Sequence, residues 1–318
     1  MLWLAGLMGL MAVGAAAYVD IGDDGLDDDE DLEQSSTDLA KVNLIRGTDI
    51  ADMIAGTPEN DRIGAGDGDD LVEAGTGDDE VRGDSGDDTL SGQDGSDTLF
   101  GADGEDDLFG GDADDTLVGQ NDDDVLFGED GDDRLNGSDG DDRLAGGAGD
   151  DALSGGLGGD VLRGGAGEDT LFGGAGDDTL SGVVADPEGD ALSDTDEGDF
   201  LNGGSGDDAI IAGQYDQVHG GAGADQIILG DWIENGANAA ITDFEPEEDS
   251  LLFVWDDSAA DAEAPEITVR PDPDHAGQLQ VWMGDEVLAQ VSGQSQLSTA
   301  DIALIPLSSA MTLGFANS

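Results

Sequence analysis

An aspartate recurs at every ninth position over a large part of this chain. From Gly47 to Ser181 the sequence divides into fifteen nonamers without insertion or deletion, and the sixth position of each is Asp. A fixed period places equivalent residues at equivalent points of successive turns, so we expect these carboxylates to form columns. Carboxylates one strand spacing apart, about 4.8 Å, repel by roughly 0.9 kcal/mol even in bulk water. Such columns need cations.

The candidate metal ligands are the carboxylates of these columns, together with two from later units in which the register resumes. They are Asp70, Asp79, Asp88, Asp97, Asp106, Asp115, Asp124, Asp133, Asp142, Asp151, Asp160, Asp169, Asp178, Asp208 and Asp225. Asp52 and Asp61 hold the same position in the first two nonamers. For these two, a ligand and a solvated, turn-forming carboxylate remain equal alternatives, because Asp is a common turn residue.

The nonamer GGAGEDTLF, residues 164–172, indicates how the carboxylate is held. Its glycines permit positive φ, so the loop turns tightly and aims carbonyl oxygens at one point. We expect residues 170–172 to form a three-residue strand with Leu171 facing inward. Two nonamers then make one 18-residue coil with a strand in each of two parallel sheets. Residues 18 apart then stack in successive coils, so we expect Asp151 to lie beside Asp169.

A cation between successive loops would meet two carboxylates and several main-chain carbonyls. Such a site offers oxygen donors alone, in a number of six or more. This set fits Ca²⁺ better than Mg²⁺, which prefers a compact octahedron with retained water, and better than Zn²⁺, which prefers nitrogen and sulfur.

The repeat resembles the hemolysin-type calcium-binding, or RTX, nonapeptide family, written GGxGxDxUx. Residues 160–178, DVLRGGAGEDTLFGGAGDD, and residues 151–169, DALSGGLGGDVLRGGAGED, match linked units fully. The resemblance implies an all-β fold, a right-handed parallel β-roll solenoid with a small C-terminal β cap, and calcium between its turns. It also implies that loop carbonyls join the aspartates as ligands. The loop glycines concerned are Gly147, Gly149, Gly156, Gly158, Gly165, Gly167, Gly174 and Gly176.

Four nonamers depart from the family pattern at their fourth position. The glycine expected there is replaced by Ile50, Glu59, Ala113 and Asp122. We expect these loops to bind calcium poorly or to act as spacers.

The composition divides the chain into six segments. They are an apolar segment at 1–19, an acidic spacer at 20–46, the repeat block at 47–182, an inserted loop at 183–193, further repeats at 194–231 and a C-terminal region at 232–318. The last has the aromatic and β-branched residues of strands separated by turns, and we expect it to form a small β-domain or a cap over the end of the roll.

Residues 1–19 carry no charged side chain. As a helix they would span roughly 28 Å, close to a bilayer core. Three interpretations are open: a membrane anchor, a signal peptide cleaved after its small residues, or a buried helix. No Lys or Arg precedes the apolar run, which weakens the signal-peptide interpretation.

The C-terminal region carries a second resemblance. Residues 241–254, ITDFEPEEDSLLFV, are similar to the I-x-D-F-x-x-x-x-D segment that follows such repeats in serralysin-like secreted proteins, and residues 291–305 are similar to their terminal segment. This implies a type I secretion apparatus as a partner. We expect Trp232, Trp255 and Trp282 to lie in the core of the cap.

The composition argues against several functions. A net charge of -70 with only 8 Lys and Arg excludes nucleic-acid binding through phosphates. The chain has no Cys, which excludes disulfides and thiolate metal sites. No HExxH, GxSxG or P-loop motif occurs, and neither His219, expected at a turn or on the surface, nor His275, expected in a loop, sits in a catalytic motif. The sequence therefore predicts no enzyme.

Two functions remain. The first is a non-enzymatic, calcium-folded protein of the cell surface or extracellular space, secreted or anchored through residues 1–19, with a structural or adhesive role and an unidentified surface or matrix partner. The alternative is a calcium-dependent targeting module of a secreted hydrolase or polysaccharide-modifying enzyme. For the first, we expect the repeats to be unfolded where calcium is scarce and to fold where it is abundant.

Overall fold

The computed structural model describes residues 42–185, 192–193, 198–230, 232–233, 237–255, 257, 264–292 and 297–310. The expectations for the apolar segment 1–19, and for nearly all of the spacer 20–46, lie outside the described residues. Within them, no helix has the length and apolar character needed to cross a bilayer.

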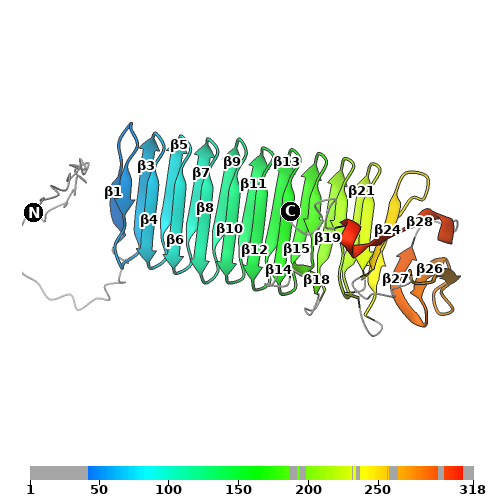
Figure 1. Ribbon diagram of the computed structural model, residues 1–318. Helices are drawn as coiled ribbons and strands as arrows, with labels where there is room; N and C mark the ends of the chain where they lie inside the picture. Colours follow the sequence, from blue (N-terminus) through cyan, green and yellow to red (C-terminus); the bar gives the residue numbers. More distant parts are fainter. Residues whose placement is uncertain are drawn as a thin grey trace, which may run out of the picture.

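The described residues form one elongated roll made of two long sheets that face each other (Figure 1). The first sheet has fourteen described strands, in the spatial order β1 (Asn43–Arg46), β3 (Asp61–Asp67), β5 (Glu80–Ser85), β7 (Thr98–Asp103), β9 (Thr116–Asn121), β11 (Arg134–Asp139), β13 (Ala152–Leu157), β15 (Thr170–Ala175), β19 (Phe200–Ser205), β21 (Gln217–Ala222), β23 (Ala239–Ile241), β27 (Glu286–Ser292), β26 (Gln278–Met283) and β25 (Ile267–Pro271). The expected parallel β-roll is confirmed.

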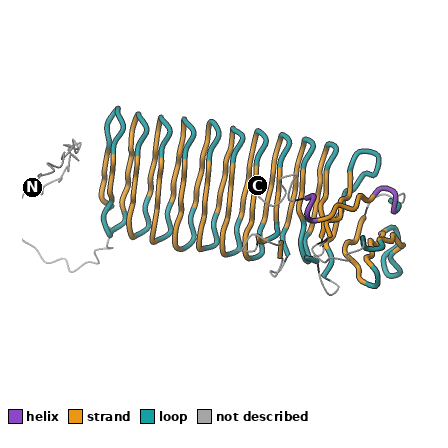
Figure 2. The backbone as a smooth tube through the Cα atoms, in the orientation of Figure 1, coloured by secondary structure: helices purple, strands orange, loops and turns teal. Residues whose placement is uncertain are grey.

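The second sheet takes the alternate strands of the chain. Its twelve described strands are β2 (Met53–Ala55), β4 (Leu71–Thr76), β6 (Thr89–Asp94), β8 (Asp107–Asp112), β10 (Val125–Asp130), β12 (Arg143–Ala148), β14 (Val161–Ala166), β16 (Thr179–Ser181), β20 (Ala209–Ile211), β22 (Gln226–Gly230), β24 (Ser250–Trp255) and β28 (Ile302–Pro306). The connecting loops line both long edges of the roll (Figure 2).

The register is set by the 18-residue coil, as predicted. Thr170 pairs with Ala152 and Leu171 with Leu153, each one coil apart. Most strands have six residues, not the three expected, because pairing resumes beyond the first glycine of the next nonamer at Gly174 and Ala175. Glycine at these positions still offers main-chain groups to the ladder, and its missing side chain does not interrupt pairing.

The core is a stack of single aliphatic side chains. The eighth residue of each nonamer from Leu90 to Leu180 is 0–2% exposed, while its neighbours in the strand point outward. Burying one such side chain stabilises the fold by roughly 1.5–3 kcal/mol. With so narrow a core, each coil depends on the coil before and the coil after it.

A short hairpin leaves the roll between β16 and β19. Its strands, β17 (Val184–Ala185) and β18 (Leu192–Ser193), pair antiparallel. The coil that contains it is longer than the others, yet the register continues, with Leu171 paired to Leu201. An insertion at a loop is tolerated because it leaves the stacked strands in place.

The C-terminal region is continuous with the roll and forms its cap. Strands β24 and β28 extend the second sheet in parallel, while β27, β26 and β25 extend the first and end it with two antiparallel pairings. A short 3₁₀ helix, η1 (Thr299–Asp301), and a one-turn helix, α1 (Leu307–Ala310), flank β28. These elements cover core residues that the last coil would otherwise expose.

The three tryptophans of the cap differ in their surroundings. Trp232 is 6% exposed and donates its indole N–H to the carbonyl of Ala212 at 2.9 Å. Trp255 is half-buried and packs on the core. The expectation of a core position is wrong for Trp282, whose ring lies 4.6 Å from the Arg270 guanidinium on the face of β26 turned away from the core.

Truncation of one core leucine should destabilise the roll markedly. We predict that Leu126→Ala lowers the free energy of unfolding of the calcium-saturated protein by about 3 kcal/mol, through lost burial and the cavity left behind. The neighbouring outward substitution Val125→Ala should cost less than about 1 kcal/mol. Urea denaturation of the two variants measures the difference, and equal losses would contradict the single-stack core.

Candidate metal centre

The sixth-position aspartates are buried and linked into two ladders, one along each edge of the roll. In each ladder the main-chain N–H of one Asp donates to Oδ1 of the equivalent Asp one coil further on, as from Asp142 to Asp160 and from Asp160 to Asp178, both at 2.8 Å. The same bond joins Asp151 to Asp169 on the other edge. The predicted columns are therefore present, with one oxygen of each carboxylate fixed by the protein.

The second carboxylate oxygen, Oδ2, has no hydrogen-bond partner in all fifteen candidate ligands. These residues, each 0–3% exposed, are Asp70, Asp79, Asp88, Asp97, Asp106, Asp115, Asp124, Asp133, Asp142, Asp151, Asp160, Asp169, Asp178, Asp208 and Asp225. A buried carboxylate oxygen without a partner is costly. A column of such oxygens therefore favours a bound cation.

The first glycine of the loop makes room for this oxygen. From Gly83 to Gly173 the first position is always glycine, and a Cβ added at Gly155 would overlap Oδ2 of Asp160. The second glycine allows the loops to stack closely, because a Cβ on Gly165 would overlap the carbonyl oxygen of Gly147. Carboxylates and carbonyls thus approach each other along the edge.

The second and fourth positions share a left-handed backbone. Gly165 and Gly167 have φ of 117° and 142°, and the other predicted loop glycines, Gly147, Gly149, Gly156, Gly158, Gly174 and Gly176, also have positive φ. Ala113 and Asp122 adopt the same region, at 85° and 72°. The backbone of these two loops therefore matches that of the glycine loops at this position, and weak calcium binding by them stays a prediction. Ile50 and Glu59, in contrast, are absent from the positive-φ residues of the described chain.

Burial and mutual repulsion disfavour the charged form of these carboxylates. Burial, reinforced by the charge of Asp106, raises the pKa of Asp124 to about 8. Burial likewise raises the pKa of Asp97, Asp106 and Asp151 to about 7. The N–H bond to Oδ1 opposes the shift without cancelling it. Without a cation, these carboxyls therefore resist ionisation at neutral pH.

The donor set fits calcium. Within the described residues, no three His, Cys, Asp or Glu side chains converge on one point. A cation at this edge must therefore combine column carboxylates with loop carbonyls, which are all hard oxygen donors. Ca²⁺ accepts such mixed oxygen sets of flexible geometry, whereas Zn²⁺ would find no nitrogen or sulfur.

A second ladder of carboxylates runs along each edge in the opposite direction. At the fifth position, Asp150 accepts the N–H of Glu168 at 2.9 Å, and Asp141 accepts that of Gly159 at 2.8 Å. This ladder was not predicted from the sequence, although frequent Asp-Asp pairs at positions five and six are a visible signal of it. These outer carboxylates are exposed and hold successive loops in register.

The columns continue beyond the predicted ligands. The N–H of Asp169 donates to Asp199, that of Asp199 to Asp216, and that of Asp225 to Asp249 at 3.1 Å. Asp199 and Asp216 could have been found by following the register. Asp249 could not be found from a nine-residue period, because it lies 24 residues after Asp225.

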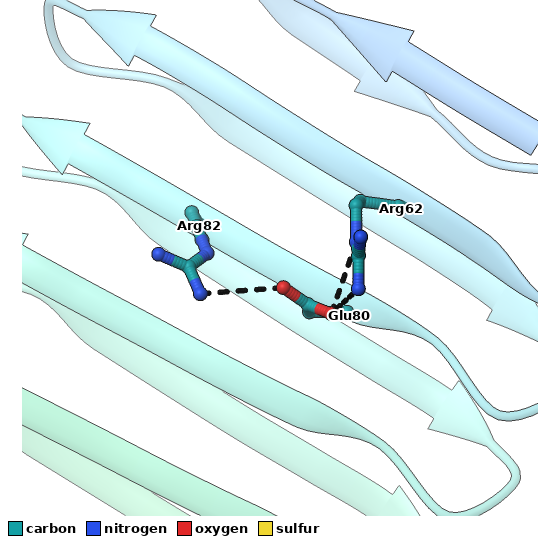
Figure 3. Close-up of polar contacts among 3 residues, drawn as sticks. All are labelled: Arg62, Glu80 and Arg82. Atoms are coloured by element: carbon teal, nitrogen blue, oxygen red, sulfur yellow. Dashed lines mark hydrogen bonds and ion pairs between the residues drawn. The ribbon is translucent and has the colours of Figure 1, made fainter.

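The positive side chains lie away from these edges. Arg62 and Arg82 stand on the outer face of the first sheet and both pair with Glu80, Arg82 at 3.3 Å (Figure 3). Every other arginine of the described repeats, Arg46, Arg134, Arg143 and Arg163, is also an exposed strand residue. Exposed pairs of this kind contribute little stability. Among the described residues, no arginine of the repeats therefore lies beside the carboxylate columns.

The two histidines are not part of the columns. His219 lies on the outer face of β21, not at a turn, with its ring 5.1 Å from that of Phe200. His275 lies in the predicted loop and contacts Asp272 at 3.2 Å. The rings of Phe109 and Phe127 stack on the outer face of the second sheet, with ring centroids 5.4 Å apart.

A protein-family comparison identifies the repeat. The model of the RTX calcium-binding nonapeptide repeat matches residues 46–81, 82–117, 109–144, 118–153, 130–162, 154–182, 186–214 and 215–231, which together make up more than half of the chain. No curated protein matches the chain.

Among solved structures, the chain is similar to the extracellular lipase LipA from Serratia marcescens, with 15% identity and a TM-score of 0.23. The match covers 73% of this chain and 45% of the lipase, so the chain spans less than half of that protein's length. A likeness at this identity and TM-score carries no argument about activity.

The raised pKa values predict that acid favours the metal-free roll. A carboxyl whose pKa is higher in the roll than in the unfolded chain stabilises the roll below about pH 4, and this contribution is lost as pH rises through about 6 to 8. Metal-free protein should therefore gain β-structure in circular dichroism as pH falls from about 8 to about 5. A β signal that stays constant or declines would contradict the prediction.

A matched pair of variants isolates the buried column. Asp106→Asn removes a buried charge while keeping an Oδ1 acceptor, whereas Asp107→Asn removes the exposed charge next to it. We predict that Asp106→Asn moves the pH midpoint upward and stabilises the metal-free roll at neutral pH by on the order of 2 kcal/mol. Asp107→Asn should leave the midpoint nearly unchanged.

Proposed function

The chain belongs to the RTX calcium-binding nonapeptide repeat family, and from this we propose that it is a non-enzymatic, calcium-folded protein of the cell surface or extracellular space with a structural or adhesive role. The observation that carries the proposal is the row of fifteen buried Oδ2 atoms without a hydrogen-bond partner. Each is a ready anionic ligand that the protein itself does not satisfy.

The residues that would hold calcium are the column aspartates together with loop carbonyls, such as those of Gly147 and Gly165. Bound calcium supplies positive charge to oxygens that otherwise repel one another. The Oδ1 ladder orients each carboxylate, and the glycine loops keep the carbonyls close to it. Because this arrangement exists only in the roll, the free energy of binding adds to the free energy of folding.

A calcium requirement suits a protein that must leave the cell before it folds. The cytosol is poor in calcium, whereas the extracellular medium contains it at on the order of 10⁻³ M. Dissociation constants of weak extracellular calcium sites lie in the same range. We propose export through a type I secretion apparatus, on the serralysin-like resemblance of residues 241–254 and 291–305. A form anchored in a membrane through residues 1–19 is the alternative.

The outer faces of the sheets support a structural or adhesive role. They carry the arginines and the outward-facing aromatic residues of the repeats, including the exposed Phe127, on which the half-buried Phe109 stacks. Such side chains are typical of surfaces that contact a partner. Neither histidine of the chain lies beside a nucleophile in a known catalytic motif, which favours a binding role over catalysis.

A calcium count on column variants tests the proposal. We expect the combined substitutions Asp151→Ala, Asp160→Ala and Asp169→Ala to lower the number of calcium ions bound at saturation and to loosen the middle coils. Removal of three exposed charges, by Asp94→Ala, Asp112→Ala and Asp130→Ala, is the matched control and should keep the count. Equilibrium dialysis gives both numbers, and equal counts in the two variants would contradict the ligand role.

A second candidate function rests on the outer face of the cap. There Thr268 lies opposite Trp282, and Arg270 stacks on the indole. An aromatic ring and a guanidinium on an outer sheet face are groups that contact saccharides, which favours a polysaccharide-directed targeting module.

Polysaccharide binding separates the two functions. If the cap is a targeting module, Trp282→Ala should weaken retention of the calcium-loaded protein on a polysaccharide column by about tenfold. Phe127→Ala, an exposed aromatic on the roll, should have no effect. Absence of retention across a panel of neutral and acidic polysaccharides would leave the structural role as the better account.

A further inference from the structure

Four column carboxylates differ from the others in what their Oδ2 atom contacts. Oδ2 of Asp52 accepts the main-chain N–H of Thr48 at 2.7 Å, and Oδ2 of Asp61 accepts that of Thr57 at 2.5 Å. At the other end of the roll, Oδ2 of Asp216 accepts the N–H of Gly213 at 2.6 Å. These carboxylates are satisfied by the loop in which they lie.

The fourth of them, Asp249, repeats the pattern of the first two. Its Oδ2 accepts the N–H of Glu245, four residues earlier, at 2.7 Å, while its Oδ1 accepts the N–H of Asp225. Both of its oxygens therefore have protein donors. In contrast, Oδ2 of Asp225, one step back in the same column, has none.

The residue at the second loop position explains the difference in the first coil. From Gly66 to Gly174 this residue has positive φ in every nonamer, whether it is glycine or an unbranched residue such as Gln93 or Glu129. Thr48 and Thr57 occupy the same position, and neither is among the positive-φ residues of the described chain. A β-branched side chain is strongly disfavoured at positive φ. The loop therefore takes another path and turns its N–H toward the carboxylate.

The column that begins with Asp61 has a neutral residue, not a carboxylate, at its outer end. Elsewhere Oδ1 accepts the N–H of the preceding Asp, but Oδ1 of Asp61 accepts the side-chain amide of Asn43 at 2.8 Å. The Thr57 hydroxyl contacts the same oxygen at 3.1 Å. A neutral amide thus takes the place that an aspartate would occupy in a further coil.

These self-satisfied loops lie at the two ends of the repeat array. Asp52 directly precedes β2 and Asp61 begins β3, next to β1, whereas Asp216 directly precedes β21 and Asp249 directly precedes β24. Figure 1 shows β1 and β3 at one end of the roll, and β21 and β24 near the cap at the other. A terminal loop has a stacked neighbour on one side only, so it can share a cation in one gap, whereas an inner loop can share one in each of two gaps. Hydrogen bonds within the loop compensate the carboxylate in place of the missing contacts.

We propose that the roll is closed at both ends by metal-free turns, in which Asp52, Asp61, Asp216 and Asp249 bind main-chain N–H groups in place of calcium. Calcium is confined to the loops between them, and in the first coil the β-branched residue at the second loop position, Thr48 or Thr57, decides that the loop is metal-free. This inference rests on the proposed calcium-binding function and assigns which repeats carry it out.

Calcium stoichiometry of the full chain tests the assignment. Wild-type protein is compared with two double variants of equal charge change, Asp52→Ala with Asp61→Ala, and Asp151→Ala with Asp160→Ala. We expect the first pair to bind as many calcium ions at saturation as the wild type, and the second pair to bind fewer. An equal loss in both pairs would overturn the inference, whereas a wild type that binds no calcium would overturn the proposed function itself.

Conversion of the end loops provides a second, independent readout. The variant carries glycine at the second and fourth positions of the first two loops, by Thr48→Gly, Ile50→Gly, Thr57→Gly and Glu59→Gly. These glycines should allow positive φ, free the Oδ2 atoms of Asp52 and Asp61, and raise the number of calcium ions bound. The control, Thr48→Val with Thr57→Val, keeps the β-branch and the N–H while removing the hydroxyl, and should leave the count unchanged. An unchanged count in a glycine variant with native β signal, or a raised count in the valine control, would overturn the role of the second position.

Discussion

The structure depends on the repulsion between buried carboxylates that stack at strand spacing. One oxygen of each is held by an N–H from the neighbouring coil, as in the bond from Asp142 to Asp160. The other oxygen is buried without a partner. Hydrophobic burial of one leucine for every nine residues must overcome this repulsion and the entropy of ordering glycine-rich loops. Stability is therefore tied to whatever neutralises the columns.

Other features follow from the same constraint. From Gly83 to Gly173 the first position is glycine because Oδ2 occupies the place of its side chain. From the third nonamer onward the second and fourth positions take positive φ so that successive loops can stack. Arginines are confined to the sheet faces, away from the loops. In the middle of the roll, residues such as Gln93 and Glu129 hold positive φ at a cost of about 1 kcal/mol or more each. The loops near Gly165 avoid this cost by using glycine.

Much of the fold could be predicted from the sequence, because a nine-residue period leaves few alternatives. The inward leucine, the 18-residue coil and the pairing of Asp151 with Asp169 all follow from spacing alone. The extended strands could not be foreseen, since glycines at positions such as Gly174 carry no strand signal. Nor could the fate of the Oδ2 atoms of Asp52 and Asp61, which depends on the φ of the threonine four positions before each. The position of Trp282 could not be foreseen either, because it lies on the face of β26 opposite Val281 and Met283, and the sequence does not show which face of this strand meets the core.

The central claim is that calcium compensates the columns and so folds the roll. The most direct test is far-UV circular dichroism of the full chain at neutral pH during a calcium titration, with magnesium titrated in parallel. We predict a cooperative gain of β-structure with calcium and little change with magnesium, because the donor set suits the larger and more flexible ion. A spectrum that is already β-rich without metal, and that calcium leaves unchanged, would contradict the claim.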